Sequence, residues 1–417
     1  MTSLRILSLL LAFNSFQIEI LRAEEPLPAL KSVALMEKWI AGLDNSDHFS
    51  PLILKELNAT DTEIKKKAIL EYSNHLLKNF SSLTGMARED HYNAFLKTAN
   101  HLVPEAKICS YFYDCYSKNI VNLNGLNVLF EHYNRRKKHP NRFSSSKAID
   151  ASALVNELND MEKESFTGEK SLLVRQRGEK SKHVTPVLIR KTASETQFIL
   201  LDSLGSGSDS AYDWSAVTEV DIRNSNLPNI RVHKFSLKRQ NDGRSCPIFA
   251  FKDALQNTKT NLFDQIDACT QEGLQAGFDS DLKENSLQII PDCTYPNSYT
   301  MNSILPHFMK MAQNVQMVEE YLKKNPAYSN TPVSSRGTLS EITTLHKDAK
   351  GSTYARKHAY KYYGIILGDI LGETQGGKNQ ENHGRKSAMV EELRGKDEWV
   401  LAHVSRHHGG VQALSAP

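Results

Sequence analysis

Four side chains that support thiol chemistry follow one another along the chain: His183, Asp202, Gln240 and Cys246. A thiol becomes a strong nucleophile only when it ionises, so Cys246 needs a base such as the His183 imidazole. A carboxylate such as Asp202 can orient that imidazole and stabilise its protonated form. The Gln240 amide and the backbone N–H of Cys246 can donate to the oxyanion that forms when a thiolate attacks a carbonyl group. The set therefore predicts a cysteine enzyme.

The hydrophobic pattern places the imidazole and the acid at one end of a β-hairpin. Apolar segments at 184–189 and 198–201 flank polar residues at 191–196, which is typical of two strands joined by a turn. His183 then opens the first strand, and Asp202 closes the second. Because antiparallel pairing aligns the start of one strand with the end of the other, we expect the two side chains to lie side by side.

The residues after Cys246 predict a buried helix. Apolar residues at 248, 251 and 255 recur at helical spacing, with good helix formers between them. Pro247 suits the first helical position, which makes Cys246 the N-cap. The thiol would then lie at the positive end of the helix dipole, where a thiolate is favoured.

The order His, Asp, Gln, Cys, with Gln240 six residues before Cys246 and Phe249-Ala250 just after it, resembles the CE clan of cysteine proteases and related acetyltransferases. One branch of the clan contains the SUMO and ubiquitin-like protein proteases, and the other is the YopJ-type family of bacterial effectors. Leu305-Pro-His-Phe-Met-Lys310, Gln313 and Tyr321-Leu-Lys-Lys-Asn-Pro326 are similar to the pattern that follows the catalytic domain in YopJ-type proteins. The nineteen-residue step from His183 to Asp202 also suits that branch.

The resemblance covers residues 120 to 350 and implies an α+β fold. We expect a CE-clan cysteine protease-like core, a small mixed sheet with helices, flanked by N- and C-terminal helical regions. The resemblance implies His183 as base, Asp202 as orienting acid, Gln240 as oxyanion donor and Cys246 as nucleophile.

The activity that the resemblance implies is that of a bacterial effector acetyltransferase, secreted into a host cell as a virulence factor. Such an enzyme moves an acetyl group from acetyl-CoA through Cys246 to Ser, Thr or Lys of host proteins. The resemblance also implies inositol hexakisphosphate as an activator. The sequence does not assign the residues that bind the activator or coenzyme A.

Two departures from the family pattern bear on the alternatives. The protease branch has Trp after the catalytic His, where this chain has Val184, which speaks against a cysteine protease that removes ubiquitin or a ubiquitin-like modifier and makes that activity the second hypothesis. Both branches usually have Gly after the nucleophile, where this chain has Pro247, which favours a third hypothesis of a catalytically inactive interaction protein.

Other residues compete for the roles of acid and base. Asp209 and Asp213 are rival acids in a Ser/Gly-rich loop, and His233 is a rival base on a predicted strand. His403, His407 and His408 could place two imidazoles on one helix face, but no third ligand accompanies them, so no metal is expected.

The charge and the cysteines limit the possible partners and compartments. Lys and Arg number 51 against 48 Asp and Glu, a net charge of +3, which does not favour nucleic acid as a partner. Several groups of basic side chains are expected on solvated surfaces. The family resemblance implies the alternative that some of them bind the phosphates of inositol hexakisphosphate or coenzyme A. These are residues 65–67 and 135–138, Lys323, Lys324, Lys347, Lys350 and Arg356. An odd number of irregularly spaced cysteines does not resemble a disulfide framework, so a reducing compartment such as the cytoplasm is expected: Cys109, Cys115, Cys246, Cys269 and Cys293.

Five regions are predicted: a leader or disordered N-terminus at 1–26, a helical region at 27–140, a catalytic core at 141–300, a helical regulatory region at 301–375, and a linker with a charged tail at 376–417. The apolar segment at 6–13 has the length of a signal-peptide core and is too short to span a bilayer. Further helix signals are capping boxes at 60–63 and 338–341, and helical spacing at 305–322 and 354–372.

Overall fold

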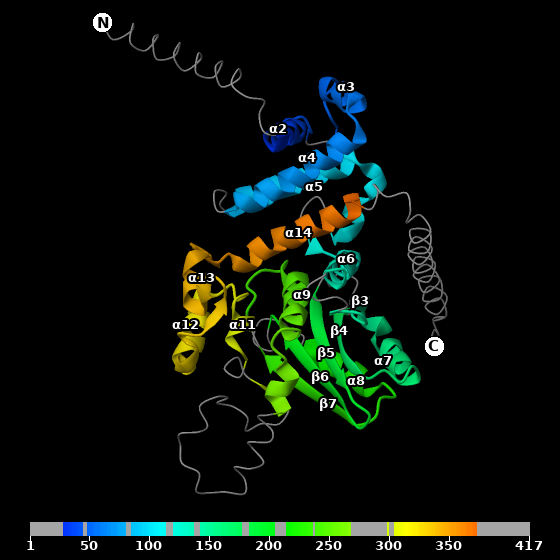
Figure 1. Ribbon diagram of the computed structural model, residues 1–417, viewed down its shortest axis with the longest axis vertical. Helices are drawn as coiled ribbons and strands as arrows, with labels where there is room; N and C mark the ends of the chain where they lie inside the picture. Colours follow the sequence, from blue (N-terminus) through cyan, green and yellow to red (C-terminus); the bar gives the residue numbers. More distant parts are fainter. Residues whose placement is uncertain are drawn as a thin grey trace, which may run out of the picture. The chain divides into compact units, whose positions relative to one another are not determined.

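The computed structural model in Figure 1 describes residues 28–44, 48–80, 85–113, 120–136, 142–176, 183–204, 214–236, 238–267, 298–299 and 304–372. By its internal contacts the chain divides into residues 1–368 and 369–417. Helices surround a mixed six-stranded sheet, which confirms the α+β class.

The sheet has the strand order β3-β4-β5-β6-β7-β8. Its strands are Lys147–Asp150 (β3), Gly168–Arg175 (β4), Val184–Lys191 (β5), Thr196–Asp202 (β6), Ile230–Ser236 (β7) and Ser298–Tyr299 (β8). The β4–β5 and β5–β6 pairs are antiparallel, and the other three pairs are parallel. Pairing of Lys191 with Thr196 and of Val187 with Leu200 confirms the predicted hairpin. The start of β5 and the end of β6 therefore lie side by side at one end of these two central strands.

Helices cover both faces of the sheet, which explains why β5 and β6 are buried along nearly their whole length. Helices α7 (Leu154–Lys163) and α8 (Trp214–Arg223) pack on one face, where Leu158 and Ile222 join alternate residues of β4 to β7 in one core. Helix α9 (Cys246–Asn257) contacts β4, β5 and β6. Figure 1 shows α9 on the opposite side of the sheet from α7 and α8.

The N-terminal described region is helical, as predicted for residues 27 to 135. It contains α2 (Pro28–Ala41), α3 (Pro51–Ala59), α4 (Thr62–Lys78), α5 (Gly85–Leu102), α6 (Leu123–Asn134), two short 3-10 helices (Pro104–Ala106, Ile108–Tyr111) and a small ladder of β1 (Phe112–Tyr113) and β2 (Ile120–Val121). The predicted cap at Thr60 is wrong. Thr60 closes α3, with its hydroxyl donating to the Glu56 carbonyl at 2.8 Å, so Asp61 caps α4 by accepting from the Glu63 N–H.

The region after the sheet contains α11 (Pro306–Met309), α12 (Val315–Lys324), α13 (Leu339–Leu345), α14 (Tyr354–Gly372), a 3-10 turn (Pro326–Tyr328) and the short strands β9 (Pro332–Ser334), β10 (Gly337–Thr338), β11 (Lys347–Asp348) and β12 (Gly351–Ser352). The capping box of Thr338 and Glu341 and the helix ending at Gly372 are confirmed. A single helix over 305–322 is wrong, because the backbone N–H and C=O of Gln313 bond outside the helix, to Arg239 and Ser352.

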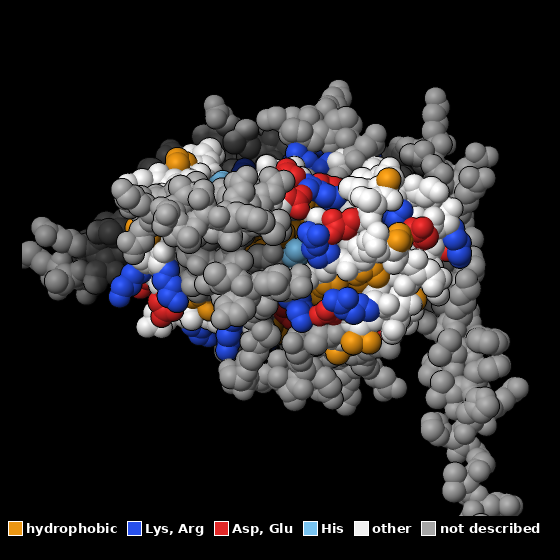
Figure 2. Space-filling model, turned by 90° about the horizontal axis from the view of Figure 1, so that it is seen from below, with side chains coloured by type: hydrophobic (Ala, Val, Ile, Leu, Met, Phe, Trp, Pro, Cys, Tyr) orange, Lys and Arg blue, Asp and Glu red, His pale blue; other side chains and the backbone are white. Residues whose placement is uncertain are grey.

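Two properties of the described surface bear on partners. On the face that Figure 2 shows, basic and acidic side chains are interspersed, as expected for a net charge of +3. No helix among the described residues has the length and apolar composition needed to cross a lipid bilayer.

The packing of α9 generates a stability prediction. Phe251 is fully buried, and its ring lies 5.3 Å from those of Phe130 and Tyr362, measured between ring centroids. We expect Phe251→Ala to lower the free energy of unfolding by about 3–5 kcal/mol, because it leaves a cavity between α9 and its neighbours. Urea unfolding followed by circular dichroism measures the loss. Val220→Ala, at an exposed position, is the control and should change it by less than about 0.5 kcal/mol.

Candidate active site

His183 and Asp202 meet at the edge where β5 begins and β6 ends. The Nε2 atom of His183 lies 3.1 Å from Oδ1 of Asp202, and both side chains are buried. Oδ1 also accepts from the backbone N–H of Leu204 at 2.9 Å, which fixes the carboxylate on the turn after β6. A buried carboxylate with two donors is well placed to orient an imidazole.

Cys246 is a buried free thiol in the first turn of α9. The predicted N-cap is wrong by one residue: Ser245 is the cap, and its carbonyl accepts from the N–H groups of Ile248 and Phe249. The shift arises because the Asp242 carboxylate accepts from the Arg244 and Ser245 N–H groups and turns the chain into the helix early. The thiol still lies at the positive end of the helix dipole, where its anion is favoured.

The His183 imidazole connects the other two groups. Burial alone would lower its pKa, but hydrogen bonds and charges from Asp202 and Cys246 outweigh burial and raise the pKa from 6.5 to about 10. The ring is therefore protonated at neutral pH. An imidazolium between a carboxylate and a sulfur is the arrangement that keeps a cysteine ready as a thiolate.

Gln240 lies beside the loop that leads to Cys246, and its amide is already engaged. Its Oε1 accepts from the Ser203 hydroxyl at 2.8 Å, and its Nε2 donates to the backbone carbonyl of Asp242. The second amide proton faces Oδ1 of Asp242 at 3.4 Å, a long contact that an oxyanion could replace. The role of oxyanion donor stays a prediction for Gln240.

Of the rival groups, the structure describes only His233, because Asp209 and Asp213 lie outside the described residues. His233 is buried in β7 opposite Ile199, three residues and about 10 Å before the edge that holds Asp202. Burial, with a smaller contribution from Arg231, lowers the pKa of His233 to about 4, so the ring is neutral. Its place within the sheet argues against a role as the base for Cys246.

Two residues near the thiol carry no sequence signal. Arg175 ends β4 and donates from Nη1 to the Tyr113 hydroxyl at 3.0 Å, while its Nε donates to Asp150. Burial raises the pKa of Tyr113 against the opposing effect of Arg175, and Cys246 adds a small further increase, so the phenol is within electrostatic reach of the thiol. Tyr113 and Arg175 are 62 positions apart in the sequence, and only the fold brings them together.

Cys109 forms a disulfide, which corrects the expectation that the cysteines contain none. A bridge needs only two Cα atoms about 6 Å apart, which spacing along the chain does not reveal.

Metal binding finds no support in the part of the chain that the structure describes. No group of three His, Cys, Asp or Glu there is arranged to hold a metal ion. His403, His407 and His408 lie outside the described residues.

A basic cluster lies around α9 and α14. Its members influence one another electrostatically and are Arg136, Lys252, Lys259, Lys310, Arg336, Lys357 and Lys361. Burial first, and repulsion from Lys310 and Lys259 second, lower the pKa of Lys252 to about 7. Burial and Lys259 lower the pKa of Lys310 to about 8. Only Arg136 belongs to the basic residues that the sequence singled out, because the others come from segments far apart in the chain.

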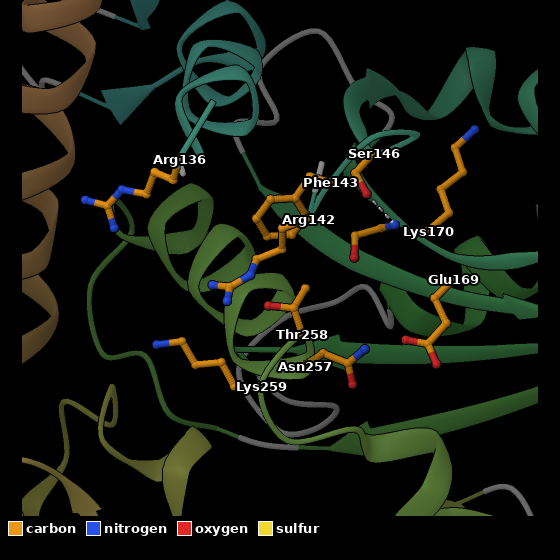
Figure 3. A pocket seen from close by; sticks show the side chains of 10 residues that line it. Arg136, Arg142, Phe143, Ser146, Glu169, Lys170, Asn257, Thr258 and Lys259 are labelled. Atoms are coloured by element: carbon orange, nitrogen blue, oxygen red, sulfur yellow. Dashed lines mark hydrogen bonds between the residues drawn. The ribbon is translucent and has the colours of Figure 1, made fainter. Parts of the chain in front are cut away.

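A pocket of about 950 Å³ adjoins this cluster at the C-terminal end of α9, about 16 Å along the helix from Cys246. Its lining residues are Arg136, Arg142, Phe143, Ser146, Glu169, Lys170, Ser171, Asn257, Thr258 and Lys259. Figure 3 shows the tips of Arg136, Arg142 and Lys259 on one side of the pocket, with Glu169 and Lys170 on the other. Glu169 forms an ion pair with Arg190 at 2.9 Å, and Lys170 forms one with Glu157. Because these two charges are balanced by their partners, the charge of the pocket comes from Arg136, Arg142 and Lys259.

A buried thiol, imidazole and carboxylate at the edge of a mixed sheet form the kind of site that cysteine-dependent acyl-transfer enzymes use. A family model described as YopJ Serine/Threonine acetyltransferase matches residues 107–363. The chain therefore belongs to the YopJ Serine/Threonine acetyltransferase family, which confirms the resemblance read from its sequence.

Solved structures of two proteins are similar to this chain. AvrA delL154 with IP6 and CoA is 18% identical, with a TM-score of 0.44 over 74% of this chain and 99% of that chain. HopZ1a in complex with IP6 is 11% identical, with a TM-score of 0.45 over 84% of this chain and 98% of that chain. No curated protein sequence matches the chain.

The raised pKa of His183 predicts how stability depends on pH. The folded protein holds this pKa at about 10 and an unfolded chain returns it to 6.5, so the stabilisation is complete below pH 6.5 and is lost as the pH rises to about 10. We expect Asp202→Asn to lower the free energy of unfolding by about 2–3 kcal/mol at the acidic end of this range, with the deficit shrinking toward the alkaline end. Urea unfolding at a series of pH values measures this.

The exposed Asp160→Asn serves as the control for the loss of a carboxylate and should show no such trend over the same pH range. A deficit for Asp202→Asn that stays constant with pH would show that the carboxylate does not set the protonation of His183.

Proposed function

We propose that the protein is a bacterial effector acetyltransferase that acts inside a host cell. In this proposal Cys246 carries the acetyl group between acetyl-CoA and a Ser, Thr or Lys side chain of a host protein. The observation that carries the proposal is a buried imidazole that is hydrogen-bonded to Asp202, with a pKa that both Asp202 and Cys246 raise, in a chain of the YopJ Serine/Threonine acetyltransferase family.

The reaction divides into two acyl transfers at the same sulfur. In the first, Sγ of Cys246 attacks the thioester carbonyl carbon, the C–S bond to coenzyme A breaks, and His183 gives its proton to the departing thiolate. In the second, neutral His183 takes a proton from the acceptor hydroxyl or amine, which attacks the acetyl-cysteine and releases Cys246 as a thiolate. Asp202 keeps the imidazole oriented through both steps, and the Cys246 N–H and Gln240 are the proposed oxyanion donors.

The basic cluster and the adjoining pocket support the proposal that the protein binds inositol hexakisphosphate and the phosphates of coenzyme A. Burial and then repulsion from Lys310 and Lys259 lower the pKa of Lys252, and a polyanion that binds at the cluster relieves this repulsion. Arg136, Arg142 and Lys259 give the pocket the donors that phosphate groups need. Lys310, Arg336 and Lys361 come from the predicted regulatory region at 301–375, so this region is the proposed seat of activation.

The second candidate is a cysteine protease that removes ubiquitin or a ubiquitin-like modifier, since the same groups can hydrolyse an isopeptide bond. Val184 argues against it, because this residue is 1% exposed and pairs with Arg175 within the sheet. Its side chain is not available to cover a Gly-Gly tail. The third candidate is an inactive interaction protein, and its main support was Pro247 in place of the usual Gly. Pro247 occupies the second position of α9, where proline is tolerated, and it leaves the Cys246 N–H available.

One experiment separates the three candidates. The purified protein is incubated with labelled acetyl-CoA, with and without inositol hexakisphosphate, and in parallel with ubiquitin and SUMO that carry thiol-reactive C-terminal warheads. We expect labelling of protein to require the activator and to fall at least about 1,000-fold in Cys246→Ala. A warhead adduct without acetyl transfer would select the protease, and silence in both assays would select the interaction protein. Acetyl transfer that survives Cys246→Ala would remove Cys246 as the nucleophile.

The lowered pKa of Lys252 predicts that binding of the activator is coupled to protonation. At about pH 8 this amine is mostly neutral, and a polyanion raises its pKa, so binding of inositol hexakisphosphate should take up protons. Isothermal titration calorimetry in two buffers with different ionisation enthalpies measures the uptake. Lys252→Met should remove part of it, whereas Lys323→Met, at an exposed position outside the cluster, should not. Equal uptake in all three proteins would exclude the cluster as the binding site.

A further inference from the structure

The loop from Arg239 to Ser245 presents the nucleophile, and its first half is tied to the residue after the catalytic acid. The backbone N–H groups of Arg239 and Gln240 both donate to the Ser203 carbonyl at 2.9 Å. The Arg239 guanidinium is fully buried and binds the Asp253 carboxylate of α9 and the Phe308 carbonyl of α11. The start of the loop is therefore anchored to the acid turn, to α9 and to the region after the sheet.

The side chain of Gln313 binds the second half of the loop from outside it. Its Oε1 accepts from the backbone N–H groups of Asn241 at 2.6 Å and Asp242 at 3.2 Å. Its Nε2 donates to Oδ2 of Asp242 at 2.6 Å and lies 3.3 Å from the Ser245 hydroxyl. Ser245 is the residue before Cys246, and its hydroxyl also donates to Asp242 at 2.7 Å. A single amide thus contacts three residues of the loop.

The backbone of Gln313 is fixed as well. Its N–H donates to the Arg239 carbonyl at 2.8 Å, and its carbonyl accepts from the Ser352 N–H at 2.9 Å. Gly351 adopts a φ of +122°, and a Cβ at that position would lie 2.2 Å from the Gln313 carbonyl oxygen. These bonds replace the helical bonds that the sequence pattern of 305–322 predicts. The break in the helix therefore holds the amide of Gln313 against the loop.

We propose that Gln313 is a positioning residue for acyl transfer, which fixes the loop so that the Cys246 N–H and the Gln240 amide meet the oxyanion. The inference rests on the proposed acyl-transfer function. Gln240 belongs to the same loop, and its Nε2 donates to the Asp242 carbonyl. A shift of the Asp242 peptide would move both the Gln240 amide and the peptide that leads into Cys246. Misplaced oxyanion donors slow attack on a carbonyl, but they do not hinder reactions of the thiolate that form no oxyanion.

The chemistry of the contact explains why an amide is needed at position 313. The loop offers two N–H donors to one end of the side chain and a carboxylate acceptor to the other end. Glu has nearly the same shape but would place a second carboxylate against Asp242. Asn keeps the amide but is one methylene too short to reach both ends.

The test exchanges the amide and the carboxylate between the two partners. Gln313→Glu should slow acylation of Cys246 by para-nitrophenyl acetate about 10- to 100-fold, and Asp242→Asn, which opposes two amide donors, should do the same. The double variant restores one donor facing one acceptor and should recover acylation to within about 5-fold of the natural chain. Alkylation of Cys246 by iodoacetamide should change by less than about 3-fold in all three, since it forms no oxyanion.

Gln256→Glu is the matched control, because Gln256 is a buried amide on α9 whose Nε2 donates to the Thr260 hydroxyl at 3.1 Å. It should leave acylation unchanged even if the melting temperature falls. Unchanged acylation in Gln313→Glu, an equal fall of acylation and alkylation, or a double variant no faster than the singles would each overturn the proposal. A natural chain that reacts as expected with para-nitrophenyl acetate but never with acetyl-CoA would refute the proposed function and leave this inference standing.

Discussion

The site depends on the stability of a positive charge on His183 in a buried position. Burial by itself would lower the pKa of the ring, and the Asp202 carboxylate at 3.1 Å together with Cys246 outweighs that effect. Each partner is held by a different element, Asp202 by the end of β6 and Cys246 by the start of α9. The end of β6 and the start of α9 must therefore be held in a fixed relative position, to within a fraction of an ångström. Helices packed on both faces of the sheet provide the necessary rigidity.

The region after the sheet is part of the site as well as its surroundings. Arg239 reaches Phe308 and Gln313 reaches Asp242, so α11 and the break that follows it contact the loop that leads to Cys246. Lys310, on the same short segment, belongs to the basic cluster and donates to the Val333 carbonyl at 2.7 Å. Only three positions separate Lys310 in the basic cluster from Gln313, which contacts the loop before Cys246. The proposed activator would therefore bind a short distance along the chain from the residues that position this loop.

Sequence patterns predicted elements well where local physics decides and failed where distant partners compete. The hairpin of β5 and β6 and the box at Thr338 follow from alternation and from a side chain three residues away. The caps at Thr60 and Cys246 and the helix over 305–322 were wrong, because Glu56, Asp242 and Arg239 take hydrogen bonds that the local pattern had assigned elsewhere. A window of sequence does not contain those competitors.

The sequence alone determined the family, the α+β class and the closeness of His183 to Asp202, because residue order and strand alternation are local or one-dimensional properties. The tertiary structure decided that the pKa of His183 is raised, that Arg175 meets Tyr113, that seven basic residues gather around α9 and α14, and that Gln313 contacts the loop before Cys246. These features arise from segments far apart in the chain. Burial and electrostatics act over a few ångströms of space, and the sequence does not record which segments come that close.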